Sequence, residues 1–231
     1  MFLGGIVKTS TLDYPAKICA VIFTQGCNFH CPYCHNPDQI QGPGNYPGAL
    51  DETEIMAFLL KRRGLLDGVV VSGGEPTIQN DLSRFLTAIK ELGYPVKLDT
   101  NGSNPALIDQ LLSHGLVDYL AVDLKTIPKN YHLLSNDPAI SQKIIQTIEL
   151  VVASGQPAEF RTTCLTPLVD RDLITQIASA AQGPIPLYLQ KYRPERVYDR
   201  QFMSRYPRQP DENDLKDFCN LAGQYLTCRI R

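Results

Sequence analysis

Short apolar runs alternate along this chain with longer stretches of helical periodicity, and this alternation limits the possible folds more than any other feature. Strands are predicted at 18–23, 68–72, 95–99, 117–123, 158–165, 185–190 and 224–230. Helices are predicted at 51–63, 82–92, 104–114, 138–153, 172–181 and 212–223. Strands and helices in turn at this spacing are typical of βα units and a mostly parallel sheet.

The number of units sets the architecture. Six βα units and a terminal strand are expected in 231 residues, whereas a closed barrel of this kind needs eight units. We therefore expect an α/β fold, an open partial (β/α)6 barrel with a gap along one side. The length suits one domain, residues 1–231, and no internal repeat or long linker divides it.

Composition and charge exclude several classes of function. The formal net charge is −2, so the chain lacks the basic footprint of a protein that binds nucleic acid through phosphates. No apolar run approaches the ~18 residues of a membrane-spanning helix. The first residues lack the basic and apolar regions of a secretory signal, so we expect a cytoplasmic protein without a membrane partner.

The seven cysteines are unevenly distributed. Cys27, Cys31 and Cys34 form a C-x3-C-x2-C cluster directly after the first predicted strand, where α/β proteins place their chemistry. Three thiolates on one loop can hold three irons of a [4Fe–4S] cluster and leave the fourth iron open to a small molecule. A zinc site completed by His30 or His35 is the alternative.

The motifs resemble those of the radical S-adenosylmethionine superfamily. The aromatic Tyr33 before the third cysteine fits its signature, and residues 24–37, with Tyr-Cys-His-Asn at 33–36, are similar to the activating enzymes of glycyl-radical enzymes. Later segments at the ends of successive predicted strands also match: Gly73-Gly74-Glu75-Pro76, Asp99-Thr100-Asn101-Gly102 and Asp123-Leu124-Lys125.

The resemblance implies an anaerobic oxidoreductase that uses a [4Fe–4S] cluster and S-adenosylmethionine. A one-electron donor such as flavodoxin or ferredoxin reduces the cluster, and cleavage of S-adenosylmethionine yields a 5′-deoxyadenosyl radical. That radical then installs a glycyl radical on a partner enzyme. Tyr14, in the segment before the first predicted strand, makes the chain most like activators of anaerobic (class III) ribonucleoside-triphosphate reductase.

The resemblance also implies roles for individual residues. Cys27, Cys31 and Cys34 hold the cluster, and no other cysteine is required. Gly73, Gly74 and Glu75 hold the methionyl amine, with Asp99 and Asp123 adding negative charge beside it. Lys125, with Arg193, takes the methionyl carboxylate; Asn101 and Thr163 contact the ribose or adenine, and Tyr33 borders the adenine. Arg193 stands where the family often has histidine, so its role is open.

Other residues carry an argument of their own. A strand arginine is costly unless it meets an anion, so Arg161 is expected near the cofactor. Turn formation or helix capping is the competing explanation for Asp99, Asn101 and Asp123. Asp13 and Tyr14 are expected to border the entrance for a partner's glycine loop, with the arginine-bearing stretch 193–208 opposite. Turn formation before Pro15 explains Asp13 equally well.

Two alternative functions remain at this point. A small-molecule radical S-adenosylmethionine enzyme, such as 7-carboxy-7-deazaguanine synthase, has the same motifs in a short chain and needs an enclosed polar pocket. A non-catalytic module that binds zinc or an iron–sulfur cluster needs only the cysteines.

Overall fold

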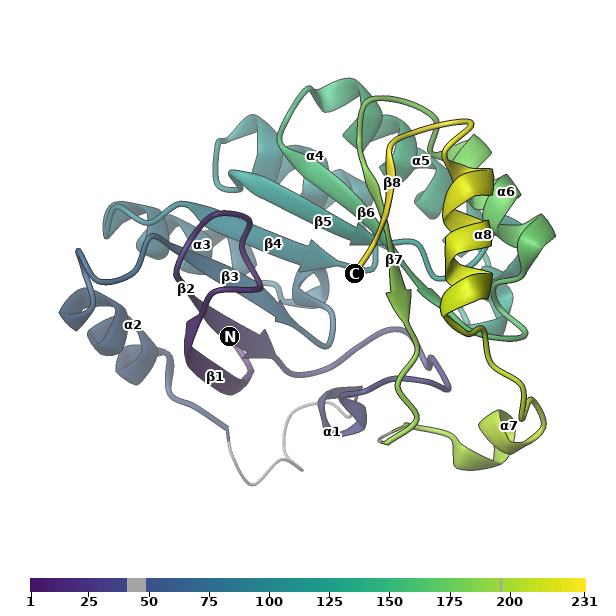
Figure 1. The fold of residues 1–231 in the computed structure, drawn as a ribbon. Coiled ribbons are helices and arrows are strands. Elements are labelled where there is room, and N and C mark those ends of the chain that lie inside the picture. The colour runs from purple at the N-terminus through teal and green to yellow at the C-terminus, as the bar shows by residue number, and fades with distance from the viewer. Residues whose placement is uncertain (41–48, 196) are drawn as a thin grey trace. The chain divides into compact units, whose positions relative to one another are not determined.

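The computed structural model describes residues 1–40, 49–195 and 197–231 (Figure 1). These residues fall into two compact units. The first lies within residues 1–28, 38–100 and 106–120, and the second within 29–37, 101–105 and 121–231. The predicted loop at 36–49 contains a short helix, α1 (Pro37–Ile40), and its residues 41–48 lie outside the described part. A single domain over the whole chain stays a prediction.

The strands confirm the predicted fold class. In the described residues, eight strands follow one another in chain order, which is the order of an open sheet. They are β1 (Leu3–Ser10), β2 (Cys19–Thr24), β3 (Gly68–Gly73), β4 (Val96–Thr100), β5 (Tyr119–Asp123), β6 (Ala158–Cys164), β7 (Leu187–Lys191) and β8 (Cys228–Ile230). The pairs β2–β3, β3–β4, β6–β7 and β7–β8 are parallel, as βα connections require.

The predicted helices are also present, with ends that differ by a few residues. They are α2 (Glu52–Lys61), α3 (Leu82–Glu91), α4 (Pro105–Ser113), α5 (Ile140–Ser154), α6 (Arg171–Ala180) and α8 (Glu212–Ala222). A short helix, α7 (Arg200–Ser204), and 3-10 turns at 76–78 and 128–133 were not predicted. Short elements of this kind lack the length that makes periodicity visible in a sequence.

Strand β1 corrects the prediction that the run at 18–23 is the first strand. β1 pairs antiparallel with β2 in the first unit, so the segment with Asp13 and Tyr14 connects two strands. Its Gly4-Gly5 pair and Lys8 hide the apolar pattern, because glycine is a poor strand former. β1 is defined by its backbone hydrogen bonds to β2, and its side chains show no clear alternation of apolar and polar residues.

The core of the first unit explains two of its elements. Val69, Val70 and Val71 of β3 are fully buried on both faces of the strand, as in a parallel sheet covered on both sides. In α3, buried side chains recur at helical spacing: Leu82, Phe85, Leu86 and Ile89. Each such side chain contributes about 1.5–3 kcal/mol by leaving water.

The second unit is built in the same way. In β6, Phe160 and Thr162 are buried against the helices, while Glu159, Arg161 and Thr163 share the other face of the strand. α8 packs against α6 and against β8 (Figure 1). Alternate residues of β6 therefore place Phe160 and Thr162 on one face and the charged pair Glu159 and Arg161 on the other.

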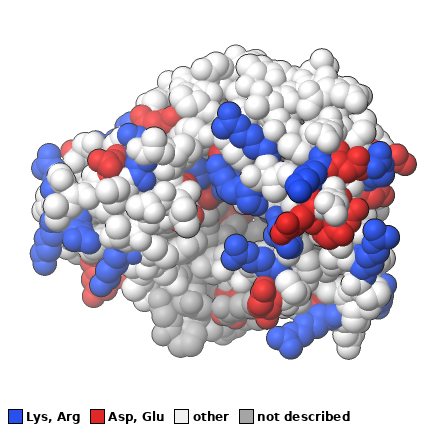
Figure 2. Space-filling model, in the orientation of Figure 1, with Lys and Arg blue, Asp and Glu red and all other residues white. Residues whose placement is uncertain are grey.

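None of the helices in the described residues is long and apolar enough to cross a membrane. Figure 2 shows cationic and anionic side chains intermixed over the viewed face, without a broad area of positive charge. That distribution agrees with the net charge of −2.

Candidate active site

The cysteine loop leaves β2 at a sharp turn in the first unit. Gly26 has a positive φ of 88°, which favours glycine. Its amide donates to the carbonyl of Gln39 at 2.8 Å, and the amide of Cys27 donates to the carbonyl of Ile40 at 3.4 Å. Helix α1 thus fixes the backbone at the first cysteine.

The rest of the loop belongs to the second unit. The amide of Cys34 donates to the carbonyl of Cys31 at 3.0 Å, and the amide of His30 donates to the carbonyl of Leu134 at 2.8 Å. The carbonyl of Pro32 accepts from Asp199, at the start of α7. These backbone bonds hold the second and third cysteines close together on a tight turn.

The thiols fit an iron–sulfur cluster. Within the described residues none of the three forms a disulfide; Cys31 is buried, and Cys27 and Cys34 are half-buried. Burial raises the pKa of Cys31 to about 11, although the Lys125 ammonium acts in the opposite direction. The hydroxyl of Tyr33 is buried and lacks a hydrogen-bond partner among the described residues. Soft sulfur donors on one loop are the ligands that iron–sulfur clusters use, and binding must displace the thiol protons.

Among the described residues, no three histidine, cysteine, aspartate or glutamate side chains are arranged to hold one metal ion. A [4Fe–4S] cluster needs a different arrangement from a single ion, because each thiolate binds a separate iron.

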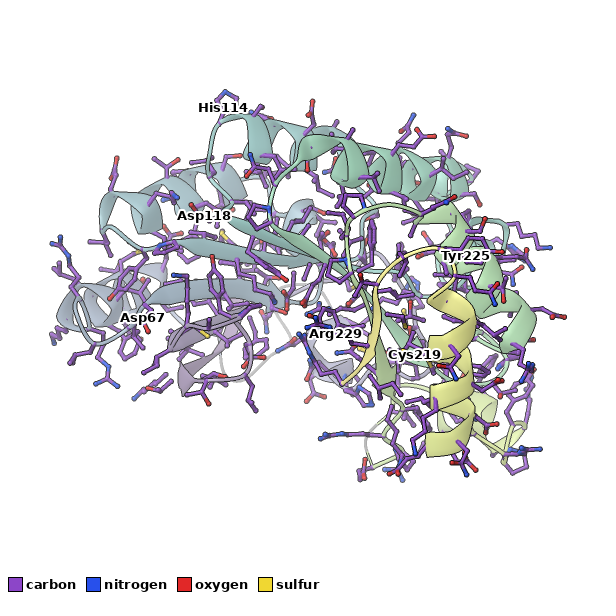
Figure 3. The ribbon with its side chains drawn as sticks, turned by 45° about the horizontal axis from the view of Figure 1, so that its top comes forward. Asp67, His114, Asp118, Cys219, Tyr225 and Arg229 are labelled. Atoms are coloured by element: carbon purple, nitrogen blue, oxygen red, sulfur yellow. The ribbon has the colours of Figure 1, made fainter. Side chains whose placement is uncertain are left out.

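The four remaining cysteines lie elsewhere. Cys19 is fully buried in an apolar cluster with Tyr14, Val21 and Val70. Cys219 lies on α8 (Figure 3) and shares a hydrogen bond with Cys228 of β8, whose pKa is raised first by burial and then by that bond. Cys164 is buried at the end of β6. Packing accounts for Cys19.

The Gly73-Gly74 pair packs against the start of the cysteine loop. A Cβ on Gly74 would lie 2.1 Å from the carbonyl oxygen of Gly26, and one on Gly73 would lie 2.3 Å from the amide nitrogen of Thr24. The amide of Gly74 donates to Thr24 at 2.9 Å, and that of Glu75 to Gly26 at 2.8 Å. Only glycine allows the two strand ends to approach this closely.

Glu75 has an internal role that the sequence did not predict. Its carboxylate is fully buried and accepts from the Thr77 amide at 3.0 Å, the Thr77 hydroxyl at 2.5 Å and the Thr100 hydroxyl at 2.7 Å. It caps the 3-10 turn at 76–78. The carboxylate therefore ties the ends of β3 and β4 together, and its contact with a methionyl amine stays a prediction.

Asp99 forms an ion pair with a buried lysine, Lys97, that the sequence analysis did not identify. Lys97, 1% exposed, places its ammonium 2.5 Å from Asp99, and the Ser72 hydroxyl donates to the same carboxylate at 3.1 Å. The ammonium also lies 6.0 Å from the centre of the Tyr119 ring. A lysine between Val96 and Leu98 in an apolar strand was the available signal, by the reasoning that singled out Arg161.

In the second unit, Asp123 joins two cations. Arg161 Nε donates to Asp123 Oδ1 at 2.7 Å, and Lys125 Nζ donates to Asp123 Oδ2 at 3.0 Å. Burial alone would raise the pKa of Asp123, but Arg161 and then Lys125 outweigh it and hold that pKa well below its ordinary value. Arg161 thus pairs with an anion of the protein itself, and its place near the cofactor stays a prediction.

Lys125 links this network to the cysteine loop. Burial opposes its charge, yet Asp123, Tyr33 and Cys31 together raise the pKa of Lys125 well above its ordinary value. Its amide donates to the buried Tyr131 hydroxyl at 3.0 Å. Cys31, Tyr33, Asp123 and Lys125 are therefore electrostatic neighbours within the second unit.

Three further predicted residues lie in turns or at strand ends. Asn101 is buried and its side chain accepts from the Ser103 amide at 2.9 Å, which is turn chemistry. Thr163 is half-buried in β6, opposite Gln190 of β7. Arg193 is exposed, and its carbonyl lies 2.9 Å from Nε2 of His35, whose ring stacks on Tyr192. His35 was not assigned this role from the sequence.

The structure also places the two expected entrance residues. Tyr14 is 4% exposed and packs in the apolar cluster with Cys19, so it is a core residue and not a lip of the entrance. Asp13 accepts a hydrogen bond from the Ser10 hydroxyl within the β1–β2 connection. It precedes β2, whereas the cysteine loop follows β2. These contacts favour turn formation for Asp13, and docking of a partner there stays a prediction.

Comparison with known proteins agrees with this geometry. The radical SAM superfamily model matches residues 21–178. A Methanocaldococcus jannaschii protein, provisionally named a glycyl-radical enzyme activating enzyme, is 35% identical over 97% of this chain and 92% of its own. The pyruvate formate-lyase-activating enzyme of Listeria monocytogenes is 34% identical over 59% of each chain.

A solved structure shows the same fold. Streptococcus suis SuiB, bound to its precursor peptide SuiA, superposes with a TM-score of 0.66 over 90% of this chain and 48% of its own, at 15% identity. The chain therefore belongs to the radical SAM superfamily, whose enzymes use a [4Fe–4S] cluster and S-adenosylmethionine, and within it to the glycyl-radical enzyme activating type.

Proposed function

We propose that this enzyme installs a glycyl radical on a partner enzyme, and that the partner is anaerobic ribonucleoside-triphosphate reductase. The observation that carries the activase function is the relative provisionally named as such, 35% identical over 97% of this chain. The Tyr14 form of the segment before β2 supports the choice of reductase. Tyr14 supports this choice through the sequence resemblance and not as a contact with the partner, because its side chain is buried.

The bound cluster and S-adenosylmethionine supply the chemistry, a one-electron cleavage followed by abstraction of a hydrogen atom. The protein's part is to bind, orient and exclude water. Cys27, Cys31 and Cys34 hold the cluster. The Lys125 ammonium has three N–H donors and donates one to Asp123, so the others can donate to the methionyl carboxylate.

Negative charge is available for the methionyl amine. Asp99 is held by Lys97 and Ser72, and Asp123 by Arg161 and Lys125. Fixed carboxylates of this kind bind an ammonium without first having to be ordered. Glu75, Gly73 and Gly74 shape the backbone beside Gly26, where the cysteine loop begins. Asn101, Thr163, Tyr33 and Arg193 are proposed to contact the rest of the cofactor.

The test is electron paramagnetic resonance of the partner. The reconstituted enzyme is mixed anaerobically with reductant, S-adenosylmethionine and an anaerobic ribonucleotide reductase. We expect the signal of a glycyl radical, and none with Cys31→Ala. Cleavage of S-adenosylmethionine with no radical on the reductase would contradict the choice of partner. A radical on a pyruvate formate-lyase-type enzyme in its place would keep the activase function and change the substrate.

A further inference from the structure

Glu159 is a carboxylate with no exposed surface, two residues before Arg161 on the same face of β6. Arg231 binds it in a bidentate arrangement, in which Nη1 donates to Oε1 at 3.1 Å and Nη2 donates to Oε2 at 3.2 Å. Arg161 Nη1 lies 4.0 Å from the same Oε1. A buried carboxylate is costly unless it is well paired, so this arrangement needs a reason beyond packing.

Arg231 is held in place by its surroundings. Its amide donates to the carbonyl of Leu189 at 2.8 Å, which continues the β7–β8 ladder. Its guanidinium lies 4.1 Å from the centre of the Tyr188 ring, a cation–π contact. Tyr188 in turn pairs with Arg161 in the register of β6 and β7. Arg231 therefore reaches Glu159 from a fixed backbone position.

The charges alternate along one continuous path inside the second unit. Lys125 pairs with Asp123, Asp123 with Arg161, Arg161 faces Glu159, and Glu159 pairs with Arg231. Arg161 thus stands between two carboxylates. Its Nε is committed to Asp123, while Glu159, with both oxygens already engaged by Arg231, attracts it from a greater distance.

We propose that Glu159, neutralised by Arg231, is a positioning residue for S-adenosylmethionine binding, because it holds Arg161 on Asp123 and so leaves Lys125 free to donate to the methionyl carboxylate. This inference rests on the proposed roles of Lys125 and Asp123. If Arg161 moved away, both oxygens of Asp123 would be open to Lys125, and the ammonium would be drawn from the cofactor.

Each member of the pair has a predicted failure. In Glu159→Gln, two guanidinium groups face each other with no anion between them, and Arg161 is displaced from Asp123. In Arg231→Met, Glu159 loses its partner and competes with Asp123 for Arg161. The double variant removes both imbalances, so it is expected to bind better than either single variant. Arg231→Met is also expected to lower the melting temperature, because it leaves a fully buried carboxylate with Arg161 alone, and the double variant removes that cost.

The experiment is anaerobic calorimetric titration of S-adenosylmethionine into the reconstituted enzyme without reductant, which measures binding with no turnover. Each single variant is expected to raise the dissociation constant about tenfold, and the double variant about threefold or less. At saturating S-adenosylmethionine with reductant, the cleavage rate stays within about twofold. Lys143→Met is the control, because it removes another ion pair of the second unit, with Asp137; its dissociation constant is expected to stay that of the wild type.

The outcomes separate this inference from the proposed function. Lower melting temperatures with unchanged dissociation constants would show that Glu159 and Arg231 only stabilise the fold, and would overturn the inference alone. The inference would also be overturned if the loss of binding free energy in the double variant equalled the sum of the losses in the two single variants. If the wild type and Lys143→Met bind no S-adenosylmethionine, the proposed function fails first and the inference falls with it.

Discussion

At the scale of single residues, opposite charges stand two positions apart on one strand face or just beyond a strand end. Lys97 supports Asp99, Lys125 supports Asp123, and Glu159 lies below Arg161. Every proposed cofactor-facing charge among these is thus fixed by a partner before any ligand arrives. Fixed charges bind a charged ligand without the cost of ordering side chains.

Lys125→Ala tests the claim that Lys125 binds the methionyl carboxylate. Loss of the ammonium is expected to weaken S-adenosylmethionine binding by about 1.5–3 kcal/mol, the usual range for a hydrogen bond to a charged group. Anaerobic calorimetry of the reconstituted enzyme measures it. Lys129→Ala, on the 3-10 turn at 128–133, is the matched control. An unchanged dissociation constant in Lys125→Ala would remove Lys125 from the cofactor site.

The residues of the site were predictable to different degrees. The cysteine motif and the Gly73-Gly74 pair could be singled out in the sequence because their chemistry depends on residue type and spacing, and their roles stay predictions. The internal bonds of Glu75 and the burial of Tyr14 were not, because both depend on partners distant in the sequence: Thr100 for Glu75 and Val70 for Tyr14. Lys97 and Glu159 carried the same signal as Arg161, a charge inside an apolar strand.

At the scale of elements, the turn after β3 is the most constrained segment. Gly74 in this turn accepts no side chain, because a Cβ there would lie 2.1 Å from the backbone oxygen of Gly26. Periodicity predicted β2 to β8 and the long helices, since each has a clear apolar pattern. Periodicity failed for β1 and α7, whose backbone pairing or capping decides their structure.

Gly74→Ala is expected to destabilise the protein by about 3 kcal/mol or more, by forcing β3 from Gly26 and the cysteine loop. Gly5→Ala is the control, since the atom nearest its Cβ is a ring carbon of Phe23 at 3.9 Å. Denaturant unfolding of both variants measures the difference, and the iron bound after reconstitution follows the loop. Equal stability of the two variants would show that the close approach of these backbones is not required.

At the scale of the whole molecule, the chain combines an α/β fold of common type with one loop of three cysteines. Of the other described cysteines, Cys19 is packed in a core and Cys219 and Cys228 contact each other. The identity of the partner enzyme was not predictable from the fold, because that fold is shared with enzymes acting on other substrates. It requires the radical assay described above.

The central claim is that Cys27, Cys31 and Cys34 alone hold the cluster at which S-adenosylmethionine is cleaved. The most direct measurement is the yield of 5′-deoxyadenosine from anaerobically reconstituted enzyme with a strong reductant. We expect no product from Cys27→Ala, Cys31→Ala or Cys34→Ala, and near wild-type product from Cys164→Ala, Cys219→Ala and Cys228→Ala. Product from a chain lacking any of the three loop cysteines, or its loss in a Cys228→Ala enzyme that remains folded, would contradict the claim.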